Sequence, residues 1–168
     1  LKYQTDYTDK NPDYIDAPFI TNHDMGRAAN ALRNDEDDLK IAGGLLMTLS
    51  GNPFVYYGEE IGMSSSGTKD ENKRLALIWS DSDKTGMTKG PEGADNGIVS
   101  AFAGVKEQQT DDDSILNYYK RAIRLRQHRY FCYPWQCLSR GKAHKRRGTD
   151  IACSVNAYHP DCTCFAGL

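Results

Sequence analysis

The sequence predicts an α/β fold in which a helix joins two short parallel strands. Three observations support this. Residues 17–21 form an apolar run that ends in a polar string at residues 22–24. Leucine and alanine then recur at helical spacing, and a second apolar run follows at residues 54–57. This strand, helix, strand order with short links indicates a βαβ unit, whose right-handed crossover makes the two strands parallel.

The first helix is expected to begin near Asn34 and to end at Gly51. Asn34 can cap the helix, and the acidic residues 35–38 suit the positive end of its dipole. Gly43 and Gly44 lower the helix propensity but allow a neighbouring element to approach closely. The expected apolar face consists of Leu39, Ala42, Leu45, Leu46 and Leu49.

A second helix is expected after a long connection. Residues 64–109 are rich in Gly, Ser and Asp without a period, and such long loops are usually functional or disordered. Asp113 or Ser114 then caps a helix with one apolar face and a cationic C-terminal half. The apolar face consists of Ile115, Tyr118, Tyr119, Ala122, Ile123 and Leu125.

Composition narrows the class of protein. A chain of 168 residues predicts one domain, and its mean hydropathy of −0.68 is rather polar. No apolar run approaches the length of a membrane helix, and a net charge of −2 gives no electrostatic case for nucleic acid or an anionic membrane. The chain begins at Leu1 without a basic and apolar leader, so either processing has removed a leader or the chain is an internal piece of a longer protein.

The polar string Asn22-His23-Asp24 is the strongest candidate for chemistry. The C-terminal end of a barrel strand is where catalytic residues reach into a pocket. Asp24 at the end of a buried strand could supply a carboxylate there, and His23 a hydrogen-bonding group beside it. The alternative is a turn in which Asn22 and Asp24 bond only to the local backbone.

Three motifs follow one another along the chain: Phe-x-x-Asn-His-Asp-x-x-Arg at residues 19–27, Gly-x-Pro-x-x-Tyr-Tyr-Gly-Glu-Glu within residues 51–63, and Arg-x-Ala-Leu-x-Trp within residues 69–80. Together they resemble the α-amylase family, glycoside hydrolase family thirteen. The first two resemble its seventh and eighth barrel strands, and the third resembles its Arg-x-Pro-Met-x-Trp string, with departures at Ala76 and Leu77. The resemblance implies the last two βα units of a (β/α)8 TIM barrel, a C-terminal fragment of the catalytic domain.

The resemblance also implies roles for individual residues. Asp24 would be the third catalytic carboxylate, which stabilises the transition state, and His23 would be a substrate ligand beside it. Asn22 and Arg27 would be supporting residues of the substrate-binding site. The eighth-strand segment is mostly structural in the family. Hydrogen bonding within the loop is therefore the preferred interpretation of Glu59 and Glu60, and a core or rim position that of Tyr56 and Tyr57.

The function implied is that of a retaining glycoside hydrolase acting on α-glucosidic bonds of starch-like glucans or maltooligosaccharides. The family's nucleophilic Asp and general acid Glu lie upstream of the segment that this chain matches, so the chain is expected to be inactive alone. Two alternatives stay open: an α-glucosidase or glucosyltransferase of the same family, and a non-catalytic carbohydrate-binding or assembly module. The resemblance allows calcium in the full-length parent and a secreted or cell-surface location, but the sequence decides neither.

Composition changes near residue 130, which divides the chain into a barrel part (1–130) and a Cys-rich tail (131–168). All five cysteines lie in the tail, no Cys-x-x-Cys pair occurs, and no hydrophobic period holds. No metal site is therefore expected. An irregular tail stands where the family has a β domain, and a truncated or frame-shifted end is one interpretation. The Cys and His residues in and next to the tail that are of a type that binds zinc are Cys132, Cys137, Cys153, Cys162, Cys164, His128, His144 and His159.

Overall fold

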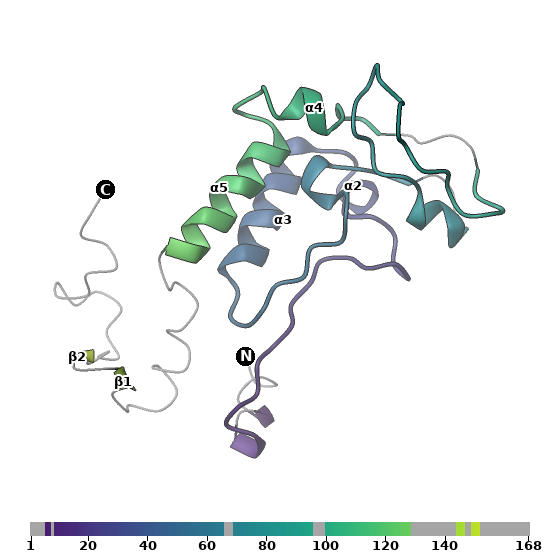
Figure 1. Cartoon of the computed structure of the whole chain (residues 1–168). Coiled ribbons are helices and arrows are strands. Elements are labelled where there is room, and N and C mark those ends of the chain that lie inside the picture. Colours follow the sequence, from purple (N-terminus) through teal and green to yellow (C-terminus); the bar gives the residue numbers. More distant parts are fainter. Residues whose placement is uncertain are drawn as a thin grey trace.

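The computed structural model describes residues 6–7, 9–65, 69–95, 100–128, 144–146 and 149–151. Two long helices lie side by side and carry the core, while the connecting segments wrap one end of this pair (Figure 1). The helices are α2 (Ala28–Ala31), α3 (Glu36–Thr48), α4 (Val105–Gln108) and α5 (Ile115–His128), with 3-10 turns η1 (Glu59–Ile61) and η2 (Glu71–Arg74).

The two expected strands at residues 17–21 and 54–57 do not form as strands, which corrects the secondary structure predicted for them. The segments do lie parallel, because one isolated parallel bridge joins Phe19 to Phe54. Two backbone bonds continue the pairing, from Asn52 N to Asp16 O at 2.7 Å and from Phe54 N to Pro18 O at 2.8 Å. Among the described residues, each segment pairs only with the other. A two-stranded pairing without further strands is marginal in water.

The first expected helix is present, with its cap shifted by one residue. Asp35, not Asn34, is the N-cap of α3, and its side chain accepts a hydrogen bond from Asp38 N at 3.0 Å. Asn34 instead has a φ of 55°, in the left-handed region that asparagine tolerates better than most residues. At the other end, Leu49 is the C-cap, and Gly51 turns the chain with a φ of 96°.

The core lies where α3 meets α5. Leu39, Leu46 and Met47 of α3 pack with Ile115 and Tyr119 of α5. The predicted face of α3 is only partly right, because Leu45 and Leu49 are 61 % and 47 % exposed and Gly43 and Met47 are buried in their place. A second cluster, built around Ile61, Met63, Leu75, Ile78 and Leu116, lies under the connecting segments.

The glycine pair allows the close approach of the two helices that the sequence predicts. A Cβ atom added at Gly43 would lie 2.5 Å from the Cε2 and Cζ atoms of Tyr119, which is 2 % exposed. At Gly44 a Cβ atom would meet the Tyr118 hydroxyl at 2.6 Å, and the next nearest atom lies at 3.5 Å. The first contact is with a buried ring, whereas the second is with the free end of a side chain that can turn away.

Gly43→Ala should therefore destabilise the chain by about 1–3 kcal/mol, the usual cost of overpacking a core. Gly44→Ala is the matched control. It should be neutral or stabilise by up to about 1 kcal/mol, because alanine is the better helix former and Tyr118 can move. Urea unfolding followed by circular dichroism measures both. Equal effects of the two substitutions would contradict the packing described here.

Ser114 caps α5, one of the two caps that the sequence allows. Its hydroxyl accepts a hydrogen bond from Asn117 N at 3.2 Å and donates to Gln108 O at 2.7 Å. The buried Gln108 side chain adds a second link, because it accepts from Leu116 N at 3.1 Å and donates to Ile61 O at 2.9 Å. The start of α5 is thus tied to α4 and η1.

The tail is described only at β1 (His144–Arg146) and β2 (Thr149–Ile151), which pair antiparallel with His144 opposite Ile151. This short pair was not expected in an irregular tail. The rest of residues 131–168, including all five cysteines, lies outside the described residues. The predictions made for the tail therefore stay predictions.

Candidate functional site

The Asn22-His23-Asp24 string forms an exposed turn at the end of the first apolar segment. Asn22 Oδ1 accepts a hydrogen bond from Asp24 N at 2.9 Å, and Met25 N donates to Asn22 O at 3.3 Å. His23 Nε2 lies 3.3 Å from Asp24 Oδ2, and the two side chains are 63 % and 68 % exposed. The local turn expected as an alternative is therefore present, and it presents the imidazole and the carboxylate together to solvent.

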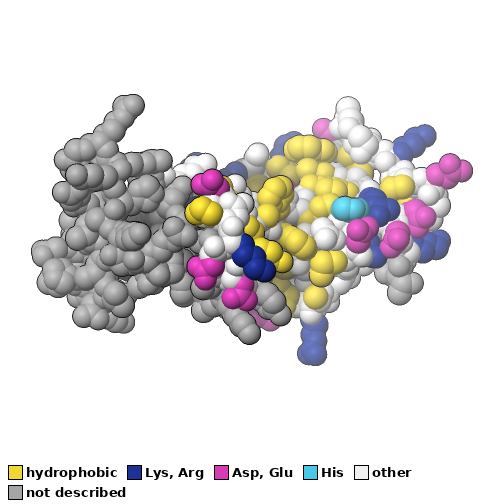
Figure 2. All heavy atoms as spheres, turned by 90° about the horizontal axis from the view of Figure 1, so that it is seen from below, with side chains coloured by type: hydrophobic (Ala, Val, Ile, Leu, Met, Phe, Trp, Pro, Cys, Tyr) yellow, Lys and Arg dark blue, Asp and Glu magenta, His cyan; other side chains and the backbone are white. Residues whose placement is uncertain are grey.

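Two cations from a distant part of the chain contact Asp24. Arg74 Nη2 lies 3.4 Å from Asp24 Oδ1, and Lys73 Nζ donates to the Asp24 backbone oxygen at 3.0 Å. Lys73 also pairs with Asp70 at 2.7 Å, and this pairing lowers the pKa of the Asp70 carboxyl. Figure 2 shows a histidine side chain with acidic and basic side chains around it, beside a broad apolar area. The site is thus a polar cluster at the edge of an apolar face.

Sequence reasoning did not assign Lys73 and Arg74 to the site. Both stand at the end of η2, 49 and 50 residues after Asp24. Arg74 is the first residue of the Arg-x-Pro-Met-x-Trp resemblance, and this was the available signal. A resemblance between motifs, however, says nothing about which side chain the motif contacts.

Arg27 lies under the site, with its side chain buried at 2 % exposure. Its guanidinium carbon lies 4.8 Å and 4.6 Å from the ring centroids of Tyr56 and Tyr57. Nη1 donates to Tyr57 O, and Nη2 donates to Lys73 O at 3.0 Å. The guanidinium is therefore directed at backbone carbonyls and ring faces, and not at the solvent that Asp24 faces.

Glu59 and Glu60 follow the second apolar segment, and Glu59 is buried while Glu60 is half-buried. Glu59 accepts hydrogen bonds from Thr21 Oγ1 at 2.7 Å and from Tyr119 Oη at 3.2 Å. Burial raises the pKa of Glu59, although these two bonds and Arg27 partly offset the rise. Burial also raises the pKa of Glu60, against the effect of backbone hydrogen bonds and of Arg27. Glu59 thus bonds beyond its own loop, to Thr21 and to α5.

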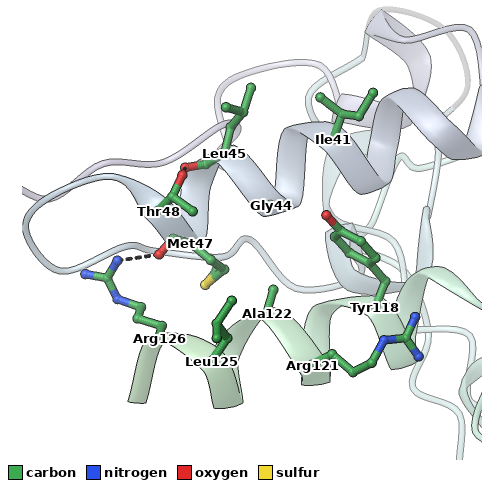
Figure 3. A pocket seen from close by; sticks show the side chains of 10 residues that line it. All are labelled: Ile41, Gly44, Leu45, Met47, Thr48, Tyr118, Arg121, Ala122, Leu125 and Arg126. Atoms are coloured by element: carbon green, nitrogen blue, oxygen red, sulfur yellow. Dashed lines mark hydrogen bonds between the residues drawn. The ribbon is translucent and has the colours of Figure 1, made fainter. Parts of the chain in front are cut away.

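An open groove of about 620 Å³ lies between α3 and α5, away from the Asn22-His23-Asp24 string. Figure 3 shows the apolar side chains that line it from the two helices, with the Tyr118 hydroxyl at one end and Arg126 at the other. Arg126 donates to the Met47 and Leu49 carbonyls, at 2.6 Å and 2.8 Å, near the C-terminal end of α3. None of the described residues that line the groove carries a carboxylate that could take part in glycoside cleavage.

No group of three or more His, Cys, Asp or Glu side chains within the described residues is placed to hold a metal ion. None of the described helices is both long and apolar enough to cross a membrane.

Comparison with known proteins identifies the family. The model of the α-amylase catalytic domain matches residues 2–133. The α-amylase SusG of Bacteroides thetaiotaomicron is 38 % identical over 129 residues, which are 75 % of this chain and 18 % of SusG. A 4-α-glucanotransferase of Thermotoga maritima is 34 % identical over 110 residues, which are 63 % of this chain and 25 % of that enzyme.

Solved structures agree with this result. The structure of Eubacterium rectale Amy13B matches with a TM-score of 0.65 and 41 % identity, over 73 % of this chain and 24 % of that one. This chain therefore spans about a quarter or less of the length of these relatives. The match to the catalytic-domain model covers well over half of the chain, and the chain therefore belongs to the α-amylase family, glycoside hydrolase family thirteen.

Proposed function

We propose that this chain supplies the transition-state-stabilising part of a retaining glycoside hydrolase that acts on α-glucosidic bonds of starch-like glucans. Residues 1–130 would be the last two βα units of its TIM barrel, and residues 131–168 a separate tail. The observation that carries the proposal is the exposed Asp24 carboxylate, which has His23 3.3 Å from one oxygen and Arg74 3.4 Å from the other.

The geometry suits a stabilising role better than a proton-transfer role. Positive charge develops on the sugar ring as the glycosidic bond breaks, and a fixed carboxylate beside the ring lowers the energy of that state. Contacts at both of its oxygens give the Asp24 carboxylate a defined orientation. His23, Asn22 and Arg74 stand beside it and can hydrogen-bond sugar hydroxyls, while the buried Arg27 can support the site only from below.

A glucosyltransferase is the second candidate, because one of the relatives is named a 4-α-glucanotransferase. Both reactions share the glycosyl-enzyme step and differ in whether water or a sugar hydroxyl accepts the glycosyl group. Product analysis of the complete enzyme on maltooligosaccharides separates them, since transfer gives products longer than the substrate. A non-catalytic carbohydrate-binding module predicts binding without any turnover in that experiment.

The chain of 168 residues should not hydrolyse a chromogenic maltooligosaccharide. Retaining cleavage needs a nucleophile and a general acid, and one stabilising carboxylate replaces neither. Release of the chromophore is followed with the purified chain and, as the control, with an Asp24→Asn variant of it. Turnover that the Asp24→Asn substitution abolishes would show that the chain is catalytically complete, and would contradict the proposal.

A further inference from the structure

The exposed Asn22-His23-Asp24 turn is fixed at both ends by buried polar residues. Thr21, directly before it, is 7 % exposed and donates to Glu59. Arg27, which ends the same motif, is 2 % exposed. A short turn without its own core takes its position from such anchors. The contacts of Arg27 therefore bear on where the Asp24 carboxylate stands.

Arg27 occupies a cradle that is shaped for a guanidinium group. The rings of Tyr56 and Tyr57 lie within 5 Å of it, where their faces attract a cation. Gly58 closes one side, since a Cβ atom there would lie 3.0 Å from Arg27 Nη1. The two terminal nitrogens are held apart in one plane and donate to two different carbonyls, whereas a lysine ammonium would have to reach both carbonyls from a single nitrogen.

One of those carbonyls belongs to Lys73, the residue that contacts Asp24. The Lys73 oxygen accepts from Arg27 Nη2 at 3.0 Å and from the Tyr56 hydroxyl at 3.1 Å. The Lys73 side chain donates to Asp24 O, and the next residue, Arg74, reaches Asp24 Oδ1. Arg27 thus holds the piece of backbone whose two side chains touch Asp24.

We propose that Arg27 is a positioning residue that fixes Lys73 and Arg74 against Asp24 and does not itself contact the sugar. This inference rests on the role of Asp24 proposed above. A side chain at 2 % exposure has no surface to offer the sugar, so Arg27 would support the site through these contacts alone. Arg27 lowers the pKa of both Glu59 and Glu60, although burial, which raises both values, is the larger effect.

A double-mutant cycle in the complete enzyme that carries this segment tests the proposal. Arg27→Lys keeps the charge but loses the fork, so kcat should fall about 10- to 100-fold while KM changes less than about threefold. In an Asp24→Asn background the same substitution should change kcat less than about twofold, because no carboxylate remains to be positioned. Arg33→Lys is the matched control on the same segment. Arg33 is exposed, and its variant should match the wild type.

The outcomes separate the two proposals. An unchanged kcat for Arg27→Lys, or the same loss in both backgrounds, overturns the positioning role while Asp24 keeps its own. If Asp24→Asn alone leaves kcat near the wild-type value, the proposed function fails and the positioning role fails with it. Should Arg27→Lys not fold, Tyr56→Phe removes the other donor to Lys73 O. Tyr56→Phe should lower kcat less than Arg27→Lys does, and this loss should also disappear in the Asp24→Asn background. A loss that persists there would show that the proposal is wrong.

Discussion

Asp24→Asn, introduced into the complete enzyme that carries this segment, should lower kcat about a thousandfold or more. The amide is close to the carboxylate in shape, so the turn and its contacts with His23 and Arg74 can remain. What disappears is the negative charge beside the sugar ring where positive charge develops. The positive charge on the sugar ring is larger in the transition state than in the bound substrate. Therefore kcat should fall much further than the affinity for substrate. Initial rates on a maltooligosaccharide, together with a binding isotherm for the variant, give both quantities.

Asp37→Asn is the control for this experiment. Asp37 is exposed in the first turn of α3, so its amide variant should keep the wild-type kcat. A near-wild-type kcat for Asp24→Asn would remove Asp24 from the catalytic machinery. A loss of substrate binding as large as the loss of kcat would instead assign Asp24 to binding in the ground state.

The helices were predictable from sequence because local signals determine them. The leucine repeat and the acidic first turn locate α3, and Ser114 marks the start of α5. The cap of α3 differed from the prediction because Asn34 and Asp35 are both good caps. Only the left-handed backbone of Asn34, set by the preceding turn, excludes it from that role.

The exposed leucines of α3 show where periodicity fails. This helix carries two apolar stripes, and one sequence cannot say which stripe meets α5. The structure buries the stripe with Leu39 and Leu46 and leaves Ile41 and Leu45 at the groove. Gly43 determines which stripe meets α5, because a Cβ atom at this position would lie 2.5 Å from the Tyr119 ring and only glycine avoids that contact.

The site could be predicted only in the part that is contiguous in sequence. The motif predicts Asn22, His23 and Asp24 as site residues. Lys73 and Arg74 reach the site only because a long connection without a hydrophobic period folds back onto it. The two expected strands also depend on distant partners. A strand predicted from an apolar run forms its ladder only when neighbouring strands complete the sheet, and the described residues supply a single bridge.

Glu59→Ala should be the substitution most damaging to stability, with a loss of about 2–5 kcal/mol. Glu59 is 4 % exposed and receives hydrogen bonds from both Thr21 and Tyr119. Its truncation leaves two buried hydroxyls without this acceptor, and each unsatisfied group costs about 1–3 kcal/mol. It also separates the first apolar segment from α5. Amide hydrogen exchange on α5 measures the free energy of opening, and an unchanged value would contradict the link.

Glu59→Gln is the conservative partner of this substitution, and its effect should depend on pH. Burial raises the pKa of Glu59 above its ordinary value of 4.5, so the folded state binds this proton more tightly than the unfolded state does. The stability contributed by Glu59 is then complete below about pH 4.5 and falls as pH rises through the folded pKa. Glutamine stays neutral and keeps an oxygen acceptor.

The stability of Glu59→Gln relative to the wild type should therefore increase as pH rises from 4. Exposed carboxyls with a lowered pKa, such as Asp70 and Asp95, contribute a pH dependence of stability in the opposite direction. This contribution is the same in both proteins and cancels in the difference. Tyr119 keeps its proton throughout, because burial and the neighbouring Glu59 raise its pKa. A relative stability that stays constant or falls between pH 4 and 8 would mean that Glu59 is ionised in the folded protein as easily as in water. The buried bonds to Thr21 and Tyr119 would then have to hold a full negative charge.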